Sequence, residues 1–383
     1  MTAIVKPAFE NMQAFRKVLS SSGYIHYYLA FGNGNMRQED WHDHASNLTS
    51  VPQKKLVELF LLNKSLETSV VLELLGEGVH QELLKAEILA EESGLTSTNG
   101  YILICFNSIL FLCEPNLHLK PPSVYFGPDS VALGTYHIPS FNGKGLDLCA
   151  GSAIQAMNVA SRCQEVYAVE INERATKLAQ FNICLNFLDE KVRLFNMSIE
   201  DFAAQNESQF DLIVFNPPFV PIPKSLKFPF VGGGGEDGLE LTKNILTLYL
   251  PRLNEGGAIE FLGFGLGSNG IARFVEDLNK ILAGRNFFGH ALLTSKFKLE
   301  PGNSFYDTLI LRGGLNSNTL IDQTYKAFGE HFEQLGVNEM YVFFMRVEKD
   351  SQRQGVDNPI VVTDIAKNLH KGSIILSQPW HFV

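Results

Sequence analysis

The sequence predicts an α/β protein, with a doubly wound sheet in its second half and a winged-helix-like α+β domain in front of it. Two observations carry this prediction. After residue 140, short apolar runs typical of strands alternate with helical patterns, the order that builds a parallel sheet with right-handed crossovers. Before residue 120, three helical patterns are followed by two apolar runs around a turn, the order typical of a winged helix.

The 383-residue chain has the composition of a globular protein, with 45% hydrophobic and 19% charged residues. That balance excludes a disordered or fibrous chain. No apolar run reaches the roughly 18 residues of a membrane span, so we expect a soluble, cytoplasmic protein. The net charge of −10 argues against a phosphate-binding surface over the whole molecule. The five Cys form no C-x-x-C pair, so we expect buried, reduced thiols and no metal site.

The first 50 residues contain one helical pattern, from Phe9 to Leu19, which ends at a Ser-rich turn before Gly23. Residues 39–44 (Glu-Asp-Trp-His-Asp-His) place carboxylates and imidazoles close together, and both are metal ligands. Adjacent positions on a loop rarely converge on one ion, so a solvated loop is the favoured interpretation.

Residues 54–89 predict three short helices, and residues 101–105 and 109–113 predict a hairpin. A winged helix that binds DNA carries Lys and Arg on its recognition helix. Residues 51–120 instead hold five Lys, no Arg and nine Glu. We therefore favour a packing or substrate-covering module over a nucleic-acid reader.

The chain is expected to divide at Lys120-Pro121-Pro122, which gives an N-terminal domain over 1–120, an α/β domain over 121–350 and a C-terminal extension over 351–383. The strands predicted for the α/β domain are 145–149, 165–170, 192–196, 211–215 and 258–261, with helices at 154–162, 173–187, 239–252 and 270–283. Residues 287–314 and 340–347 are expected to form the last strands, around a helix at 321–335. Ligands of such sheets bind at the carboxyl ends of the strands.

The first two predicted strands each carry an acidic residue at or after their middle. Asp147 is followed by a turn of small residues up to Gly151, and Glu170 ends the second strand. An acid in the latter position can accept hydrogen bonds from two ribose hydroxyls, and a small-residue turn lets a ligand approach the backbone. A full G-x-G-x-x-G motif is absent, which disfavours an NAD enzyme. A tight turn with a solvated Glu is the alternative.

The fourth predicted strand runs into Asn216-Pro217-Pro218-Phe219. Two successive prolines lack N–H groups, so the loop is stiff and its carbonyls face outward beside an amide and an aromatic ring. Such a site can accept two hydrogens from one planar nitrogen and stack against its ring. A simple turn that stops the strand is the alternative.

These motifs give the segment from about Tyr125 to Gly267 a resemblance to class I S-adenosylmethionine-dependent methyltransferases with an Asn-Pro-Pro-aromatic motif. That subgroup includes release-factor glutamine methyltransferases and enzymes that methylate amino groups of adenine or guanine. The run Gly-Gly-Glu-Asp-Gly-Leu-Glu-Leu at 234–241 is similar to the glutamine branch in order and spacing. Gly-Pro-Asp-Ser at 127–130 replaces that branch's Arg-Pro-Glu-Thr type segment, so release factors are not implied as substrates.

The resemblance implies a Rossmann-like methyltransferase sheet that binds S-adenosylmethionine. Asp147 and Gly151 would contact its methionine end, Glu170 its ribose, and Ser198 would lie near its adenine. The first loop departs from the family, because non-glycine residues stand at positions 149, 150 and 153.

The same resemblance implies that Asn216 and Pro217 hold the acceptor nitrogen next to the cofactor, with Phe219 stacking on it. The predicted function is transfer of a methyl group to a planar nitrogen of a small molecule, peptide or protein, without a metal. Methylation of rRNA or DNA is one alternative, and a cofactor-binding subunit without activity is another. The sequence predicts no oligomeric state.

Overall fold

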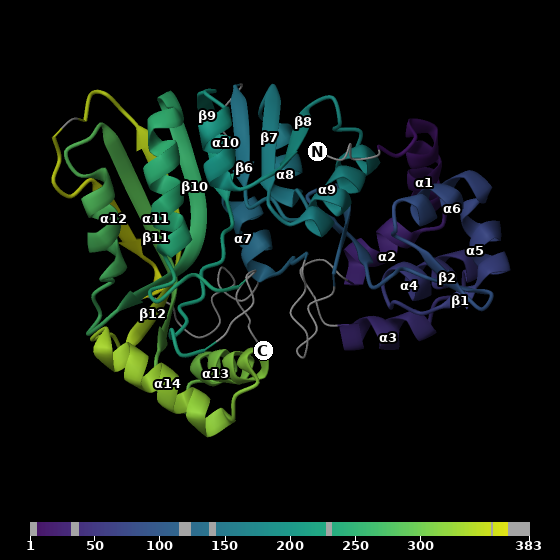
Figure 1. Cartoon of the computed structure of the whole chain (residues 1–383). Helices are drawn as coiled ribbons and strands as arrows, with labels where there is room; N and C mark the ends of the chain where they lie inside the picture. The colour runs from purple at the N-terminus through teal and green to yellow at the C-terminus, as the bar shows by residue number, and fades with distance from the viewer. Residues whose placement is uncertain are drawn as a thin grey trace.

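A mixed sheet forms the larger part of the computed structural model, which describes residues 6–31, 38–114, 124–137, 143–226, 232–353 and 355–366 (Figure 1). Its eight described strands are β6 (Lys144–Leu148), β7 (Glu165–Glu170), β8 (Val192–Asn196), β9 (Phe210–Phe215), β10 (Leu253–Gly267), β11 (Phe287–Lys298), β12 (Glu339–Lys349) and β13 (Ile360–Asp364). They lie in the order β13-β11-β12-β10-β9-β6-β7-β8. Adjacent strands in the stretch β10-β9-β6-β7-β8 are parallel to one another, whereas β12 is antiparallel to both β10 and β11. The predicted doubly wound α/β sheet is confirmed.

Helices cover both faces of this sheet. One core contains α8 (Ile154–Ala160) and α9 (Glu173–Leu185), and the other contains α10 (Ile199–Gln205), α11 (Glu240–Tyr249) and α12 (Phe274–Leu282). Successive residues of β9 alternate between the two cores, with Val214 in the first and Phe215 in the second. A strand covered on both faces has no polar side, which explains the continuous apolar run.

The strand predicted at 258–261 is only the middle of β10, which is 15 residues long. Its glycines weaken the strand pattern in the sequence. A Cβ added at Gly265 would overlap the ring of Phe274, which packs directly on the strand. Glycine is therefore required there by ring packing, and the strand continues through it.

The strands predicted over 287–314 are partly wrong. β11 ends at Lys298, and α13 (Ser304–Ser317) follows it. Asn303 caps this helix by accepting hydrogen bonds from the backbone N–H groups of Phe305 and Tyr306. The apolar residues of this stretch recur at helical spacing and are buried on one side. The predicted helix at 321–335 is confirmed as α14 (Ile321–Gln334).

The N-terminal region, which comprises the described residues from 6 to 113, lies at the other end of the molecule from β11 (Figure 1). Its elements are α1 (Phe9–Ser21), α2 (Tyr24–Phe31), α3 (Gln38–Ser46), α4 (Val51–Phe60), β1 (Leu66–Glu67), α5 (Thr68–Leu75), α6 (Glu77–Lys85), β2 (Ala90–Glu92), β3 (Leu95–Ser97), β4 (Ile102–Phe106) and β5 (Ile109–Cys113). The order α4-β1-α5-α6-β2-β3, with β1 paired to β3, is that of a winged helix. The wing is thus β2–β3 rather than the predicted hairpin of residues 101–113.

Several smaller predictions can be compared with the described residues. The solvated loop expected at 39–44 is wrong, because these residues belong to α3. All five Cys are free thiols. Part of the extension predicted over 351–383 belongs to the main sheet, because β13 pairs with β11. The expected boundary at 120–122 and the last residues, 367–383, lie outside the described residues.

The β4–β5 hairpin is joined to α9 by side-chain amides that act like a neighbouring strand. Asn182 Oδ1 accepts from Leu112 N at 2.8 Å, and its Nδ2 donates to Leu112 O at 3.0 Å. Asn186, one turn later, makes the same pair with the backbone of Leu110. Asn182 is fully buried and also donates to Ser152 O at 3.1 Å. The hairpin is therefore anchored to the turn that follows β6.

We expect Asn182→Ala to lower the free energy of unfolding by about 2–4 kcal/mol, because it leaves buried N–H and C=O groups of Leu112 without partners. Urea unfolding of the full chain measures this. Lys177→Ala, on an exposed side chain of the same helix, is the control and should change the value by less than about 0.5 kcal/mol. Equal stabilities of the two variants would contradict the role of Asn182.

Candidate active site

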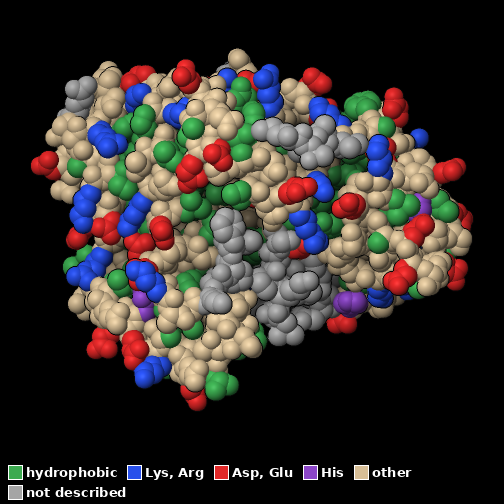
Figure 2. Space-filling view, viewed as in Figure 1, with side chains coloured by type: hydrophobic (Ala, Val, Ile, Leu, Met, Phe, Trp, Pro, Cys, Tyr) green, Lys and Arg blue, Asp and Glu red, His purple; other side chains and the backbone are tan. Residues whose placement is uncertain are grey.

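A cavity of about 750 Å³ opens at the carboxyl ends of β6, β7, β8 and β9. This volume lies in the usual range for small-molecule sites. Among its described lining residues are six of the predicted site residues: Gly151, Glu170, Ser198, Asn216, Pro217 and Phe219. The structure therefore brings both sequence motifs to one cavity. Figure 2 shows Asp, Glu, Lys and Arg side chains interspersed over the visible face of the molecule.

The turn after β6 is held in a left-handed conformation. The φ values are 59° at Cys149, 54° at Gly151 and 63° at Ala153. This backbone conformation is unfavourable for Cys149 and Ala153, because both carry a Cβ. Glu170 ties this turn to β7, since its Oε2 accepts from Gly151 N at 2.7 Å and its Oε1 from Asn172 N at 2.8 Å. A Cβ added at Gly151 would meet no atom within 4 Å, so this backbone is open to a ligand.

The Glu170 carboxylate lies at the cavity wall and is only 9% exposed. Burial raises its pKa, and the backbone N–H groups that it accepts from oppose that rise. Each carboxylate oxygen has a further lone pair beyond the backbone bonds. The residue can therefore accept hydrogen bonds from a vicinal diol, as the sequence predicts.

Asp147 does not line the cavity in the part of the chain that the structure describes. Its buried Oδ2 accepts from Ala156 N at 2.8 Å, in the first turn of α8. Burial raises its pKa to about 8. The carboxyl group satisfies one of the free N–H groups of the helix start, so its place in the fold is beneath the turn rather than at the predicted contact with a ligand.

Ser198 is the N-cap of α10. Its Oγ accepts from Asp201 N at 3.0 Å and donates to Asp201 Oδ2 at 2.9 Å. The cap places Ser198 at the cavity wall with Met197 and Glu200 as neighbours.

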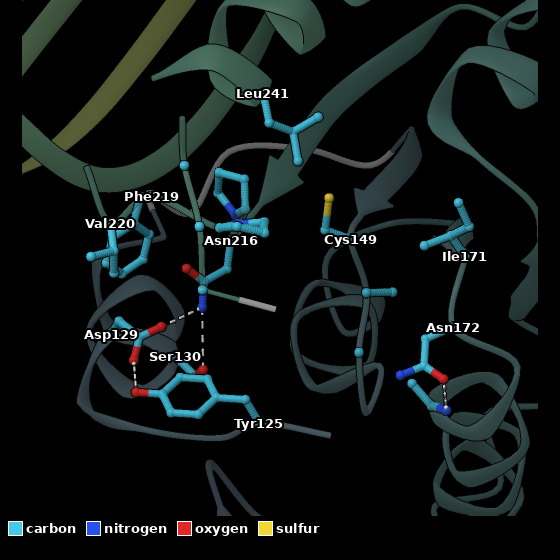
Figure 3. Close-up of a pocket in the computed structure, with 18 of the residues that line it drawn as sticks. Tyr125, Asp129, Ser130, Cys149, Ile171, Asn172, Asn216, Phe219, Val220 and Leu241 are labelled. Carbon is cyan, nitrogen blue, oxygen red and sulfur yellow. Dashed lines mark hydrogen bonds between the residues drawn. The ribbon is translucent and has the colours of Figure 1, made fainter. Parts of the chain in front are cut away.

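The Asn216 amide is held by a chain of hydrogen bonds (Figure 3). Its Nδ2 donates to Asp129 Oδ2 at 2.7 Å and to Ser130 Oγ at 3.3 Å, and Tyr125 donates to Asp129 Oδ1 at 2.6 Å. Because Asp129 accepts from the amide nitrogen, the orientation of the amide is fixed. Asn216 Oδ1 is then buried without a hydrogen-bond partner in the structure. A cavity-lining acceptor in this state can bind an N–H group of a ligand.

Sequence reasoning did not assign Asp129 to the site. The one signal was its place in the segment 127–130, which departs from the expected Arg-Pro-Glu-Thr type. Asp129 is 2% exposed, and burial raises its pKa against the effect of hydrogen bonds from Tyr125 and Asn216. Asn216 follows Asp129 by 87 residues in sequence, so no local pattern indicates this contact.

Aromatic rings and glycines surround the Asn-Pro-Pro-Phe loop. The Phe219 ring contacts that of Phe264 with centroids 4.7 Å apart, and Phe264 contacts Phe305 at 5.3 Å. A Cβ added at Gly234 would lie 2.7 Å from the Phe219 backbone, so the predicted run at 234–241 begins in direct contact with the loop. Sequence reasoning did not predict that Phe305 and the rest of one α13 face line the cavity.

This strand order, with the Asn-Pro-Pro-Phe loop at the end of β9, is the doubly wound arrangement that the resemblance to class I methyltransferases implies. Residues 131–225 match the family model described as the methyltransferase small domain.

Three relatives are similar to part of this chain. A ribosomal protein uL3 glutamine methyltransferase of Bradyrhizobium diazoefficiens is 32% identical over 37% of this chain and 47% of its own length. A tRNA1(Val) (adenine(37)-N6)-methyltransferase of Pasteurella multocida is 32% identical over 25% of this chain and 41% of its own. A chain of Methanocaldococcus jannaschii, provisionally named a protein N5-glutamine methyltransferase, is 28% identical over 38% and 74%. The match thus spans less than half the length of the first two.

We expect Asp147→Asn to change how stability depends on pH. The folded-state pKa of about 8 lies above the unfolded value of about 3.9, so the folded protein binds a proton that the unfolded chain has released. The contribution of Asp147 to the free energy of unfolding is therefore lost as the pH rises from about 4 to 8. In urea unfolding, the wild type should lose at least about 1 kcal/mol more than Asp147→Asn across this window. Parallel pH profiles would contradict the assignment.

We expect Glu170→Ala to weaken binding of S-adenosylmethionine at least tenfold, because two charge-assisted hydrogen bonds of about 1.5–3 kcal/mol each are lost. Calorimetry measures the affinity. Glu173→Ala removes an exposed carboxylate nearby and should leave the affinity unchanged. An unchanged affinity in Glu170→Ala would remove this residue from the cofactor site.

Proposed function

We propose that this protein transfers a methyl group from S-adenosylmethionine to a planar nitrogen of a small-molecule, peptide or protein acceptor. The observation that carries the proposal is the buried Asn216 Oδ1, which lines the cavity and has no partner. A hydrogen-bond acceptor with a fixed orientation binds a ligand group that donates a hydrogen bond. An amide or aryl amine nitrogen presents two N–H groups that can donate.

The residues of the cavity fit the cofactor. Glu170 can offer lone pairs to the ribose hydroxyls, Gly151 leaves its backbone open, and Ser198, which lines the cavity, would lie near the adenine. When bound, S-adenosylmethionine supplies a methyl group on a positively charged sulfur. We propose that Asp147 supports the turn after β6, because its Oδ2 accepts from Ala156 N at the start of α8.

The protein's own contribution to the reaction is to position the methyl acceptor. Methyl transfer needs the acceptor lone pair in line with the bond that breaks, and a fixed orientation supplies much of the rate. In the proposed complex, Asn216 Oδ1 and the Pro217 carbonyl each accept one N–H, which favours localisation of the lone pair on nitrogen as the new bond forms. Phe219 stacks on the acceptor, and Asp129 holds the Asn216 amide through its Nδ2.

The acceptor class is proposed from charge and packing. The net charge is −10, and α6, at the recognition-helix position of the winged helix, packs on α1, where Asn11 Nδ2 donates to Glu82 Oε2 at 3.2 Å. These features favour an acceptor without a long phosphate backbone. Methylation of an adenine amino group in RNA is the second candidate, favoured by the similarity to the tRNA methyltransferase. We also propose that the chain divides into two domains near residue 120.

The acceptor class can be tested with S-adenosylmethionine carrying a radiolabelled methyl group, incubated with a cell extract that is then separated into small molecules, protein and RNA. Label in the first two fractions supports the proposal, and label only in RNA supports the second candidate. Cofactor binding without label in any fraction would indicate a binding subunit.

We expect Asn216→Ala to lower turnover by about 10²–10³, because one preorganised partner of the transition state is lost. Its affinity for S-adenosylhomocysteine should stay within a few-fold of the wild type, which also shows that the variant folds. Phe219→Ala should mainly raise KM through lost stacking. Single-turnover transfer to the labelled acceptor, with the methyl position located by mass spectrometry, is the measurement. A methyl group on oxygen or carbon, or an Asn216→Ala variant as fast as the wild type, would contradict the mechanism.

A further inference from the structure

One face of α13 forms a wall of the cavity on the side of the Asn-Pro-Pro-Phe loop. Its cavity-lining residues are Phe305, Thr308, Leu309, Arg312, Leu315 and Asn316, which recur at the spacing of one helix face. The ring contacts Phe219–Phe264 and Phe264–Phe305 connect this face to the loop. The wall is therefore apolar near Asn216 and carries a guanidinium two helical turns beyond Phe305, about 10 Å along the axis.

Arg312 is the one Lys or Arg among the described residues that line the cavity, and four acidic residues line it as well: Asp129, Glu170, Glu200 and Glu240. Arg312 is partly buried, yet the structure shows no hydrogen bond or ion pair for it within the described chain. Arg346, by contrast, is paired with Glu260 and Glu348. A partly desolvated guanidinium presents five donors in a planar fork that matches a carboxylate or a phosphate.

The location of Arg312 points to the acceptor rather than the ribose end of the cofactor. Its charge lowers the pKa of the Tyr125 hydroxyl, against the larger effect of burial, so the guanidinium lies near the chain Tyr125–Asp129–Asn216. Glu170, the proposed ribose contact, ends β7, which is two strands away from β9 in the sheet. The cavity thus contains a hydrogen-bond acceptor for a planar nitrogen, apolar side chains and a cation.

We propose that Arg312 binds a carboxylate or phosphate group of the methyl acceptor, so that the substrate carries an anionic group as well as a planar N–H group. This inference rests on the proposed function, whose acceptor it narrows. One guanidinium in a cavity with four carboxyl groups matches a single anionic group, because a run of phosphates would meet repulsion from the acidic residues.

The test uses two matched pairs of probes, each measured by calorimetry at saturating S-adenosylhomocysteine. N-acetyl-L-glutamine is compared with its neutral methylamide, and adenosine 5′-monophosphate with adenosine. The wild type should bind the anionic member of at least one pair tenfold or more tightly than the neutral member, and the pair that shows this preference identifies a carboxylate or a phosphate.

Arg312→Gln should abolish that preference, and Arg312→Lys, which keeps the charge but not the planar fork, should retain part of it. Lys326→Gln removes the same charge from an exposed position on α14 and should leave the preference intact. An unchanged affinity of each variant for S-adenosylhomocysteine shows that it is folded and that the cofactor site is intact.

The outcomes separate this proposal from the proposed function. If the wild type binds S-adenosylhomocysteine but prefers neither anionic probe, or if Arg312→Gln keeps the preference, the role of Arg312 is overturned while the methyltransferase remains. If Arg312→Gln loses tenfold or more in affinity for S-adenosylhomocysteine, the anion is the cofactor's own carboxylate and the proposal fails. If the wild type does not bind S-adenosylhomocysteine at all, the proposed function itself fails.

Discussion

The ion pair of the buried Glu260 carboxylate with Arg346 is the interaction on which the orientation of Asn216 in the cavity depends. Glu260 lies on β10 without exposure to solvent, ion-paired to Arg346 on β12 and 2.8 Å from His137 Nδ1. A buried charge is costly unless it is paired and hydrogen-bonded, so these partners cannot separate without a large loss of stability. The pairing therefore holds β10, β12 and the end of α7 (Pro128–Tyr136) in one arrangement.

The contacts continue from His137 to the cavity. His137 Nε2 lies 3.1 Å from Gln155 Oε1, and Gln155 Nε2 donates to Ser130 O at 2.7 Å. Ser130 and Asp129 form the first turn of α7 and hold the Asn216 amide. The free Oδ1 of Asn216 thus owes its orientation to a chain of buried polar groups that begins on β10. Such a chain fixes the orientation of a side chain because each group in it is held by its neighbour.

The side of the cavity next to Gly151 is constrained in a different way. The turn after β6 has positive φ at Cys149 and Ala153, and backbone of this kind persists where its surroundings hold it. Glu170 holds the turn through Gly151 N, and Asn182 holds it through Ser152 O. Because Asn182 also pairs with Leu112, the hairpin of the N-terminal region supports the same turn. This contact gives the N-terminal region a structural connection to the site.

The sequence by itself determined the alternation of strands and helices, the bounds of β7 and β8, and the motifs at the ends of β7 and β9. These depend on periodicity and on turn chemistry, which are properties of neighbouring residues. Only the tertiary structure decided that α13 lines the cavity, that Asp129 holds Asn216, and that Asp147 lies beneath the turn. It also decided which hairpin is the wing, because strand pairing joins β1 to β3 across α5 and α6. Contacts between residues far apart in the chain depend on how elements pack, and one sequence carries no local pattern for them.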